Sequence, residues 1–164
     1  MKILFIGGQK SGKSYLAEKC VLKLSKGVKP YYIATYDNSY GDKSMQKRID
    51  IHHERRVEKF NTIEQTQSLH KVISDKNTYL VDCLSMWLLN HIYLSRKKIL
   101  KELKKLLKSK ANIVFVLNDV NSGVIPLDKI SRKYVDMSGL VGQMVVKKSN
   151  KVIKVEYGLQ TKLK

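Results

Sequence analysis

Gly7-Gly8-Gln9-Lys10-Ser11-Gly12-Lys13-Ser14 follows directly on the apolar run Ile3-Leu4-Phe5-Ile6 and has the pattern G-x-x-x-x-G-K-S. The apolar run predicts a short buried strand, and residues 15–19 predict a helix, which is the context of a phosphate-binding loop (P-loop). Its glycines permit a tight turn whose backbone N–H groups converge on phosphate oxygens, and the helix N-terminus adds positive potential. The stretch therefore predicts a nucleotide site, with a glycine-rich turn that binds no ligand as the alternative.

Two P-loop side chains and one carboxylate have predicted chemical roles. We expect Lys13 to reach the β and γ phosphates and Ser14 to hold Mg²⁺. The apolar run over residues 78–83 predicts a buried strand, and Asp82 near its end is placed where P-loop proteins commonly carry a carboxylate that orders Mg²⁺. The alternative is that Asp82 caps the helix that follows. The predicted metal ligands are thus Ser14 and Asp82.

The order of the predicted elements indicates an α/β fold. A helix over 15–25 leads to a strand over 31–35, and such a strand-helix-strand unit is right-handed and belongs to a parallel sheet. Ligands bind at the carboxyl ends of such strands, so residues 35–38 and 118–119 should face the nucleotide. The further predicted elements are helices over 42–56, 84–90, about 99–107 and 136–148, a helical or mixed segment over 60–74 with Asn61-Thr62 as its cap, a strand over 113–117 and a hairpin over 151–163. We expect residues 1–164 to form a single-domain P-loop NTPase (RecA-like) fold, with a mainly parallel sheet flanked by helices and a C-terminal antiparallel hairpin.

The composition is strongly basic, with 32 Lys and Arg against 14 Asp and Glu and a formal charge of +18. Such a charge suits a polyanionic partner. Many of the lysines, however, lie opposite the leucines of one predicted helix, where they are simply solvated. No aromatic-rich basic strand or recognition helix accompanies them. We therefore expect no nucleic-acid partner, and a basic ATPase stimulated by nucleic acid remains an alternative.

The cysteines and the first residues of the chain indicate a cytoplasmic protein. Cys20 and Cys83 lie far apart, without the spacing of a zinc site or a disulfide framework. The apolar run before Gly7 is too short for a signal-peptide core, and no run is long enough to cross a bilayer. We expect no stable membrane insertion.

The predicted helix over 42–56 carries two adjacent histidines. At about 100° per residue, His52 shares the inward stripe of this helix and His53 is rotated to its side. From this segment alone, His52 is expected to be a partly buried histidine whose ring is satisfied by a neighbour.

Several stretches together resemble the bifunctional adenosylcobinamide kinase/adenosylcobinamide-phosphate guanylyltransferase family of cobalamin assembly. The most specific signal is Arg48, His52 and Arg56, each four residues apart, because the guanylylated histidine of the family lies four residues after such an arginine. The resemblance covers most of the chain: the P-loop, residues 32–35, Met45, Ile49, Thr62, Glu64, residues 80–84 with Trp87, Leu88 and Asn90, Asn118, residues 123–126, Asp136, Gly139 and Gln143.

The resemblance implies two reactions. A nucleoside triphosphate, ATP or GTP, phosphorylates adenosylcobinamide with the help of Mg²⁺, and His52 then carries GMP from GTP to the new phosphate, giving adenosylcobinamide-GDP. A neutral imidazole is a good nucleophile, and Arg55 or Arg56 would lower its pKa and neutralise a triphosphate. The resemblance also implies a homo-oligomer, with a trimer as one form. A small-molecule P-loop kinase without guanylyltransferase activity is the alternative.

The predicted site therefore combines the motif with the resemblance. His52 and Lys13 are the expected catalytic residues. The expected nucleotide-binding residues are Gly7, Gly8, Gln9, Lys10, Ser11, Gly12, Lys13, Ser14, Tyr15, Thr35, Tyr36, Asp37, Arg56, Glu64 and Asp82. The chain departs from the family pattern at Val57, Phe60, Asp119, Asn121, Val135 and Gly142, where typical members carry Pro, Trp, Glu, Gly, Arg and Asn.

Overall fold

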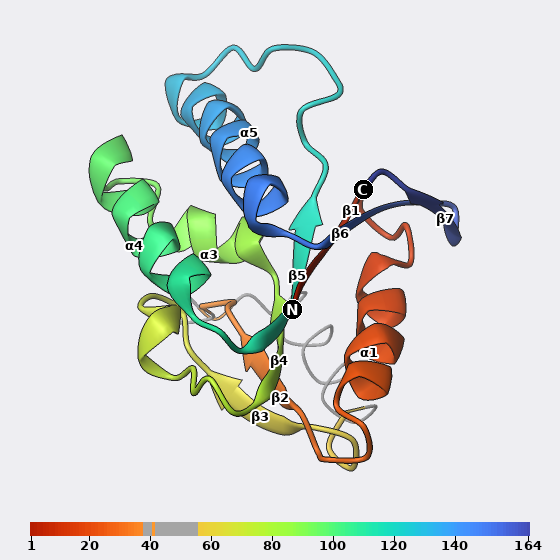
Figure 1. Cartoon of the computed structure of the whole chain (residues 1–164). Coiled ribbons are helices and arrows are strands. Elements are labelled where there is room, and N and C mark those ends of the chain that lie inside the picture. Colours follow the sequence, from red (N-terminus) through yellow and green to blue (C-terminus); the bar gives the residue numbers. More distant parts are fainter. Residues whose placement is uncertain (38–40, 42–55) are drawn as a thin grey trace.

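The centre of the molecule is a seven-stranded sheet in the order β3-β2-β4-β5-β1-β6-β7. The structure, a computed structural model, describes residues 1–37, 41 and 56–164 (Figure 1). The parallel strands are β1 (Lys2–Gly7), β2 (Tyr31–Ala34), β3 (Asn61–Glu64), β4 (Thr78–Asp82), β5 (Asn112–Asn118) and β6 (Lys151–Glu156), and β7 (Leu159–Lys162) runs antiparallel to β6. Of the helix expected over 42–56, only Arg56 is described, so His52 and its stripe lie outside the described residues.

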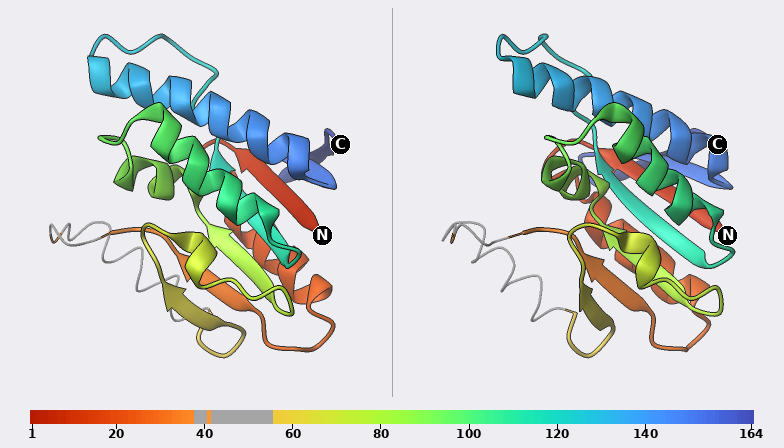
Figure 2. Two further views of the ribbon diagram at one scale, coloured as in Figure 1. Left: turned by 60° about the vertical axis from the view of Figure 1, so that its left-hand side comes forward. Right: turned by 90° about the vertical axis from the view of Figure 1, so that its left-hand side faces the viewer.

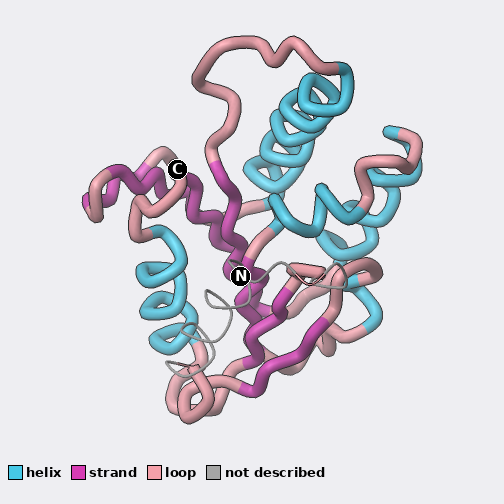
Figure 3. Tube along the Cα trace, turned by 180° about the vertical axis from the view of Figure 1, so that it is seen from behind, coloured by secondary structure: helices cyan, strands magenta, loops and turns pink. Residues whose placement is uncertain are grey.

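Helices cover both faces of the sheet. Helix α1 (Lys13–Leu24) packs on one face, and α3 (Leu84–Asn90), α4 (Arg96–Lys108) and α5 (Lys129–Lys148) pack on the other (Figures 1 and 3). Successive residues of β1 alternate accordingly, since Leu4 faces the three-helix side while Ile3 and Phe5 face α1. Because both faces are covered, the central strands are nearly continuous apolar runs, as buried parallel strands are. The predicted layered P-loop fold is confirmed.

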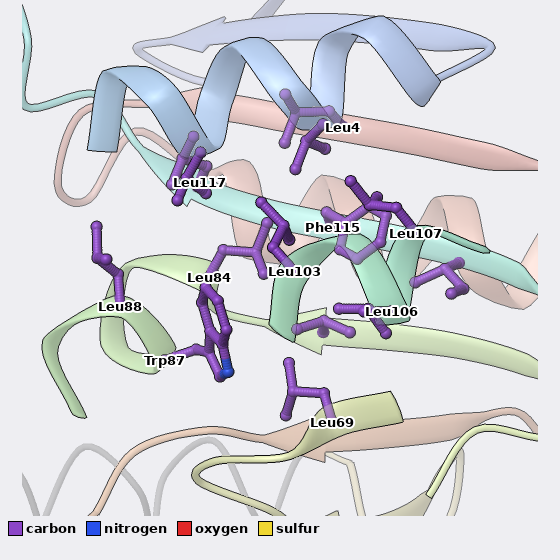
Figure 4. Packing of buried hydrophobic residues seen from close by; sticks show 14 of the residues in the cluster. Leu4, Leu69, Leu84, Trp87, Leu88, Leu103, Leu106, Leu107, Phe115 and Leu117 are labelled. Atoms are coloured by element: carbon purple, nitrogen blue, oxygen red, sulfur yellow. The ribbon is translucent and has the colours of Figure 1, made fainter. Parts of the chain in front are cut away.

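The larger core lies between the sheet and the three helices. Figure 4 shows Trp87 of α3 and Leu103 of α4 directed toward the same interior as Phe115 of β5, and all three side chains are fully buried. The indole N–H of Trp87 donates to the Gln67 carbonyl at 2.7 Å, so its one polar group is satisfied. In Figure 2, α4 and α5 lie side by side across this face. The core therefore holds the ends of β4 and β5 in fixed positions for the site.

A helical or mixed segment was predicted over residues 60–74; the mixed form is present, and the helix cap at Asn61-Thr62 was wrong. Instead of a helix capped by Asn61-Thr62, the structure has strand β3 and a short 3-10 helix, η1 (Leu69–Lys71). Strand β3 pairs in parallel with β2, so its backbone groups are used in the sheet. Thr62 and Ile63 are β-branched and favour such a strand once a neighbouring strand is available.

The long helix near the C-terminus begins earlier than predicted. Helix α5 starts at Lys129 rather than Asp136, because the Asp128 side chain caps it by accepting a hydrogen bond from the Ser131 N–H at 2.8 Å. The predicted strands over 31–35, 78–83 and 113–117 and the closing hairpin are confirmed within a residue or two at their ends. Among the described residues, no helix has both the length and the apolar character needed to cross a membrane.

Candidate nucleotide-binding and catalytic site

The P-loop joins the carboxyl end of β1 to the start of α1. Strand β1 lies between β5 and β6 in the sheet. Gly7 pairs with Asn118 of β5 and with Val155 of β6. A Cβ atom at Gly7 would lie 2.2 Å from the Val155 carbonyl oxygen and 2.8 Å from Ser11 Oγ, so no larger residue fits there. Gly12 takes a φ of 93° as the N-cap of α1, a conformation that glycine adopts without strain. These two glycines fix the shape of the loop.

Substitutions at the first two glycines are expected to differ sharply. Gly7→Ala forces the backbone of Val155 or of the loop to move, whereas a Cβ at Gly8 meets nothing within 4 Å. We expect Gly7→Ala to lower the free energy of unfolding by about 1–3 kcal/mol, as overpacking of a tight site does. The urea concentration at the midpoint of unfolding should be the same for Gly8→Ala as for the wild type. Equal midpoints for the two variants in urea unfolding would contradict this account of the loop.

Positive and hydrogen-bonding groups of the loop converge at the start of α1. Lys13 is buried, and its ammonium donates to the Gly8 carbonyl at 3.0 Å. Burial lowers the pKa of Lys13, while the charges of Cys83 and Asp82 act in the opposite direction. The Ser11 hydroxyl is also buried and has no hydrogen-bond partner within the described part of the chain. Buried hydroxyls normally find a partner, so this group suits a phosphate oxygen.

Ser14 and Asp82 meet, as the sequence predicts for metal ligands. The Ser14 hydroxyl donates to Asp82 Oδ1 at 3.3 Å, and the Tyr32 hydroxyl donates to Asp82 Oδ2 at 2.7 Å. A hydroxyl and a carboxylate are hard oxygen ligands of the kind that Mg²⁺ takes together with phosphate oxygens and water. The N-cap of α3 is Cys83 and has no side-chain cap hydrogen bond, so capping does not explain Asp82. The donor set fits Mg²⁺.

Tyr32 joins the Asp82 carboxylate to Arg56. The guanidinium carbon of Arg56 lies 3.6 Å from the centre of the Tyr32 ring, and Phe60 meets the same ring edge-on at 5.9 Å. Arg56 is buried, and this burial lowers its pKa while Asp82 and Glu18 act in the opposite direction. In the sequence, Tyr32 belongs only to a stretch that resembles the family, and no local pattern indicates its position beside Asp82.

The Thr35 side chain is hydrogen-bonded to the residue that follows Asp82. Its side chain is completely buried, and its hydroxyl donates to the Cys83 carbonyl at 2.7 Å and accepts from the Cys83 N–H at 2.9 Å. The Asn90 side chain donates to the Thr35 carbonyl at 2.8 Å and to the Thr66 carbonyl at 2.9 Å. Thr35 thus ties the end of β2 to the residue after Asp82 through its hydroxyl.

Other expected residues lie at the carboxyl ends of the neighbouring strands. Tyr36 and Asp37 follow β2 at its carboxyl end and are partly buried. Glu64 ends β3 and is exposed; it pairs with Ala34, which also pairs with Asp82 on the other side. Glu64 and Asp82 are therefore in register with each other across the sheet, on strands that are separated by β2.

The remaining loop positions are open to solvent. Gln9 and Lys10 are exposed, and Lys10 has a φ of 57°. Tyr15 is 47% exposed in the first turn of α1, where the Lys19 ammonium lies 4.5 Å from its ring centre. These side chains border the loop without closing it.

Comparison with known proteins shows to which family this chain belongs. The family model described as "Cobinamide kinase / cobinamide phosphate guanyltransferase" (CobU) matches residues 3–163. The chain belongs to the CobU family. The bifunctional adenosylcobalamin biosynthesis protein CobP of Pseudomonas aeruginosa is 34% identical over 176 residues, covering 100% of this chain and 98% of that protein. The corresponding CobU protein of Escherichia coli K12 is 28% identical over 186 residues, covering 100% of both.

A solved structure shows the same fold at low identity. The flagellar accessory protein FlaH from Methanocaldococcus jannaschii superposes with a TM-score of 0.56 at 13% identity, covering 99% of this chain and 77% of that one. At this identity the likeness concerns the fold alone. Membership of the CobU family favours the bifunctional enzyme over both alternatives, the plain kinase and the ATPase stimulated by nucleic acid.

Two departures from the CobU pattern meet in space. The Asn121 side chain donates to the Val135 carbonyl at 3.0 Å, and its Nδ2 lies 3.3 Å from the position of a Cβ at Gly139. A third departure, Gly142, lies on α5 against Leu117 of β5. These three changes therefore gather where the loop after β5 meets α5, whereas Phe60 packs on Tyr32 beside Asp82, and the Asp119 N–H donates to the Gly7 carbonyl at 2.9 Å.

Proposed function

We propose that residues 1–164 act as one catalytic domain that performs both reactions of the CobU family: phosphorylation of adenosylcobinamide, and transfer of GMP from GTP to the product. The observation that carries the proposal is the meeting of Ser14 and Asp82, 3.3 Å apart, beside the buried ammonium of Lys13. A nucleotide-binding loop with this donor set supports turnover rather than binding alone. We also propose that the protein works as a homo-oligomer, as the resemblance implies.

In the proposed kinase step, the loop amides and the N-terminus of α1 hold the triphosphate. Lys13 neutralises charge on the β and γ phosphates, and Ser14 and Asp82 would hold Mg²⁺, which when bound spreads the charge that develops during transfer. The aminopropanol hydroxyl of adenosylcobinamide attacks the γ-phosphorus, and the bond from that phosphorus to the β-phosphate oxygen breaks. The chain thus contributes mainly positioning and electrostatic stabilisation.

In the proposed transferase step, His52 is the nucleophile. Its imidazole attacks the α-phosphorus of GTP, a P–N bond forms and pyrophosphate leaves. The phosphate of the corrinoid then attacks the same phosphorus, and the P–N bond breaks to release adenosylcobinamide-GDP. Dividing the transfer into two displacements is the logic of covalent catalysis. Arg56, four residues after His52, supports this assignment because its guanidinium lies on Tyr32, next to the proposed metal carboxylate.

A labelling experiment tests the proposal directly. The protein is incubated with Mg²⁺ and GTP labelled at the α-phosphate, and the adduct is mapped by mass spectrometry. We expect an acid-labile, alkali-stable label on His52 that adenosylcobinamide phosphate removes. Nucleotide turnover without any covalent GMP would reject the transferase half and leave the plain kinase.

We propose that Tyr32 positions Asp82 for the metal. Tyr32→Phe removes the 2.7 Å hydrogen bond to Oδ2 but keeps the ring between Arg56 and Phe60. Because hydrogen bonds to charged groups are stronger than neutral ones, we expect the affinity for Mn²⁺ in the presence of GDP to fall on the order of tenfold. Electron paramagnetic resonance of Mn²⁺ measures this without turnover.

The neighbouring tyrosine provides a matched control. Tyr31 belongs to the same strand but lies on the opposite face, stacked on Tyr79 at 5.3 Å. Tyr31→Phe should bind Mn²⁺ like the wild type. If Tyr32→Phe does so as well, Tyr32 has no positioning role.

A further inference from the structure

The turn between β6 and β7 has an unusual residue. Glu156 pairs with Leu159, which leaves Tyr157 and Gly158 as a two-residue connection. Their φ angles are 51° and 81°. Two positive φ angles in a row are the pattern of the type I′ hairpin turn, where Asn-Gly and Asp-Gly are preferred. Tyrosine therefore stands where a small polar residue would suit the backbone better.

Packing does not explain this tyrosine. The Tyr157 side chain is 98% exposed, so it contributes nothing to the core. A bulky residue in the left-handed region is strained, because its Cβ crowds the following carbonyl oxygen. Strain of this kind gathers at functional sites, where the side chain is needed for another purpose.

The turn lies against the P-loop. The Gly158 N–H donates to the Ser11 carbonyl at 2.9 Å, and the Gly158 Cα lies 3.5 Å from the position of a Cβ at Gly12. Figure 1 shows β6 and β7 beside the start of α1. The backbone that carries this exposed aromatic ring is thus hydrogen-bonded, at the residue that follows, to the loop that is to hold phosphates.

We propose that Tyr157 is the base-stacking residue of the nucleotide site, its ring packing on the face of the purine while the phosphates lie on the P-loop. The inference deepens the proposed function and rests on it. Every purine offers a π-face, so a stack of this kind serves adenine and guanine alike and adds affinity without choosing between them. A two-residue turn bonded to Ser11 presents the ring more rigidly than a free loop would.

Two variants of Tyr157 separate the effect of its aromatic ring on binding from the effect of its strained backbone on stability. Tyr157→Asn removes the ring and places a residue that tolerates the left-handed backbone, so we expect the melting temperature to stay the same or rise. Its affinity for Mg·GDP should fall on the order of tenfold, as expected when one base–aromatic stack is lost. Tyr157→Phe keeps the ring and should bind like the wild type. Calorimetry with GDP, which has no phosphoryl group that the enzyme transfers, gives the affinities.

Tripolyphosphate serves as the probe that lacks a base. Its affinity should not change in Tyr157→Asn, since only the phosphate contacts remain. Tyr93→Ala is the matched control, because Tyr93 is 83% exposed and lies between α3 and α4. This control should bind both ligands normally.

Several outcomes would overturn the inference. An unchanged GDP affinity in Tyr157→Asn means that the ring does not touch the base. An equal loss for GDP and tripolyphosphate means that Tyr157 acts only on the shape of the loop. The variant Lys13→Ala tests the proposed function on which the inference rests. If this variant binds GDP and tripolyphosphate normally, the phosphates do not lie on the P-loop. Both the proposed nucleotide site and the stacking role of Tyr157 are then wrong.

Discussion

Replacing His52 by alanine is expected to abolish guanylylation of the protein by GTP while phosphorylation of adenosylcobinamide continues. Alanine has no nitrogen with which to form the P–N bond, so we expect the transferase rate to fall by at least about 10³-fold. In the proposed kinase step the P-loop holds the triphosphate and no histidine takes part, so the kinase rate should stay within about twofold of the wild type. The transferase rate is measured with GTP labelled at the α-phosphate, and the kinase rate with ATP and with GTP, each labelled at the γ-phosphate.

The adjacent histidine provides the control. His53 is rotated to the side of the predicted helical stripe, and His53→Ala should retain the covalent adduct. Full labelling of His52→Ala would show that another group carries GMP. Loss of label in both variants would point to a change in the segment as a whole rather than to one nucleophile.

Lys13→Ala is expected to have the second largest effect. Removing one preorganised cation from a transferring phosphoryl group lowers kcat by roughly 10²–10³-fold. Because we propose that the same loop holds GTP for the second reaction, the transferase rate should fall as well. Steady-state kinetics of both reactions measure the effect, and the melting temperature verifies that the variant is folded.

A lysine further along the same helix serves as the control. Lys23 is exposed near the end of α1, so Lys23→Ala changes the net charge equally without touching the loop. Wild-type kinetics in Lys13→Ala would remove the P-loop from the mechanism. Comparable losses in both lysine variants would indicate that general charge, rather than the position of Lys13, attracts the nucleotide.

The fold was largely predictable because its signals are local. Each central strand is an apolar run, and the P-loop motif states which strand and helix it joins. The segment over 60–74 was misjudged because β3 is an edge strand whose residues Asn61, Thr62 and Glu64 are exposed. Such a strand lacks the alternation of buried and exposed residues that would reveal it in the sequence. It forms because it pairs with β2, and the residues of the segment alone do not indicate that pairing.

The same distinction applies to the site. The pairing of Ser14 with Asp82 was predictable because the chemistry of a P-loop requires a carboxylate at the end of a nearby strand. Tyr32 was missed because its contact depends on the register of β2 with β4 and on the face of the sheet to which its side chain points. The contact of Gly158 with Ser11 was missed because it joins residues at opposite ends of the chain, and no local pattern announces it.

Both edges of the sheet end in short polar strands. The outermost strands, β3 and β7, have four residues each, and β7 is exposed along its whole length. Strands with charged and polar side chains at an edge resist the addition of another strand, a device that guards against aggregation. If the chain assembles with copies of itself, helices and loops are therefore expected to form the contacts, and the sheet should end at its own seven strands.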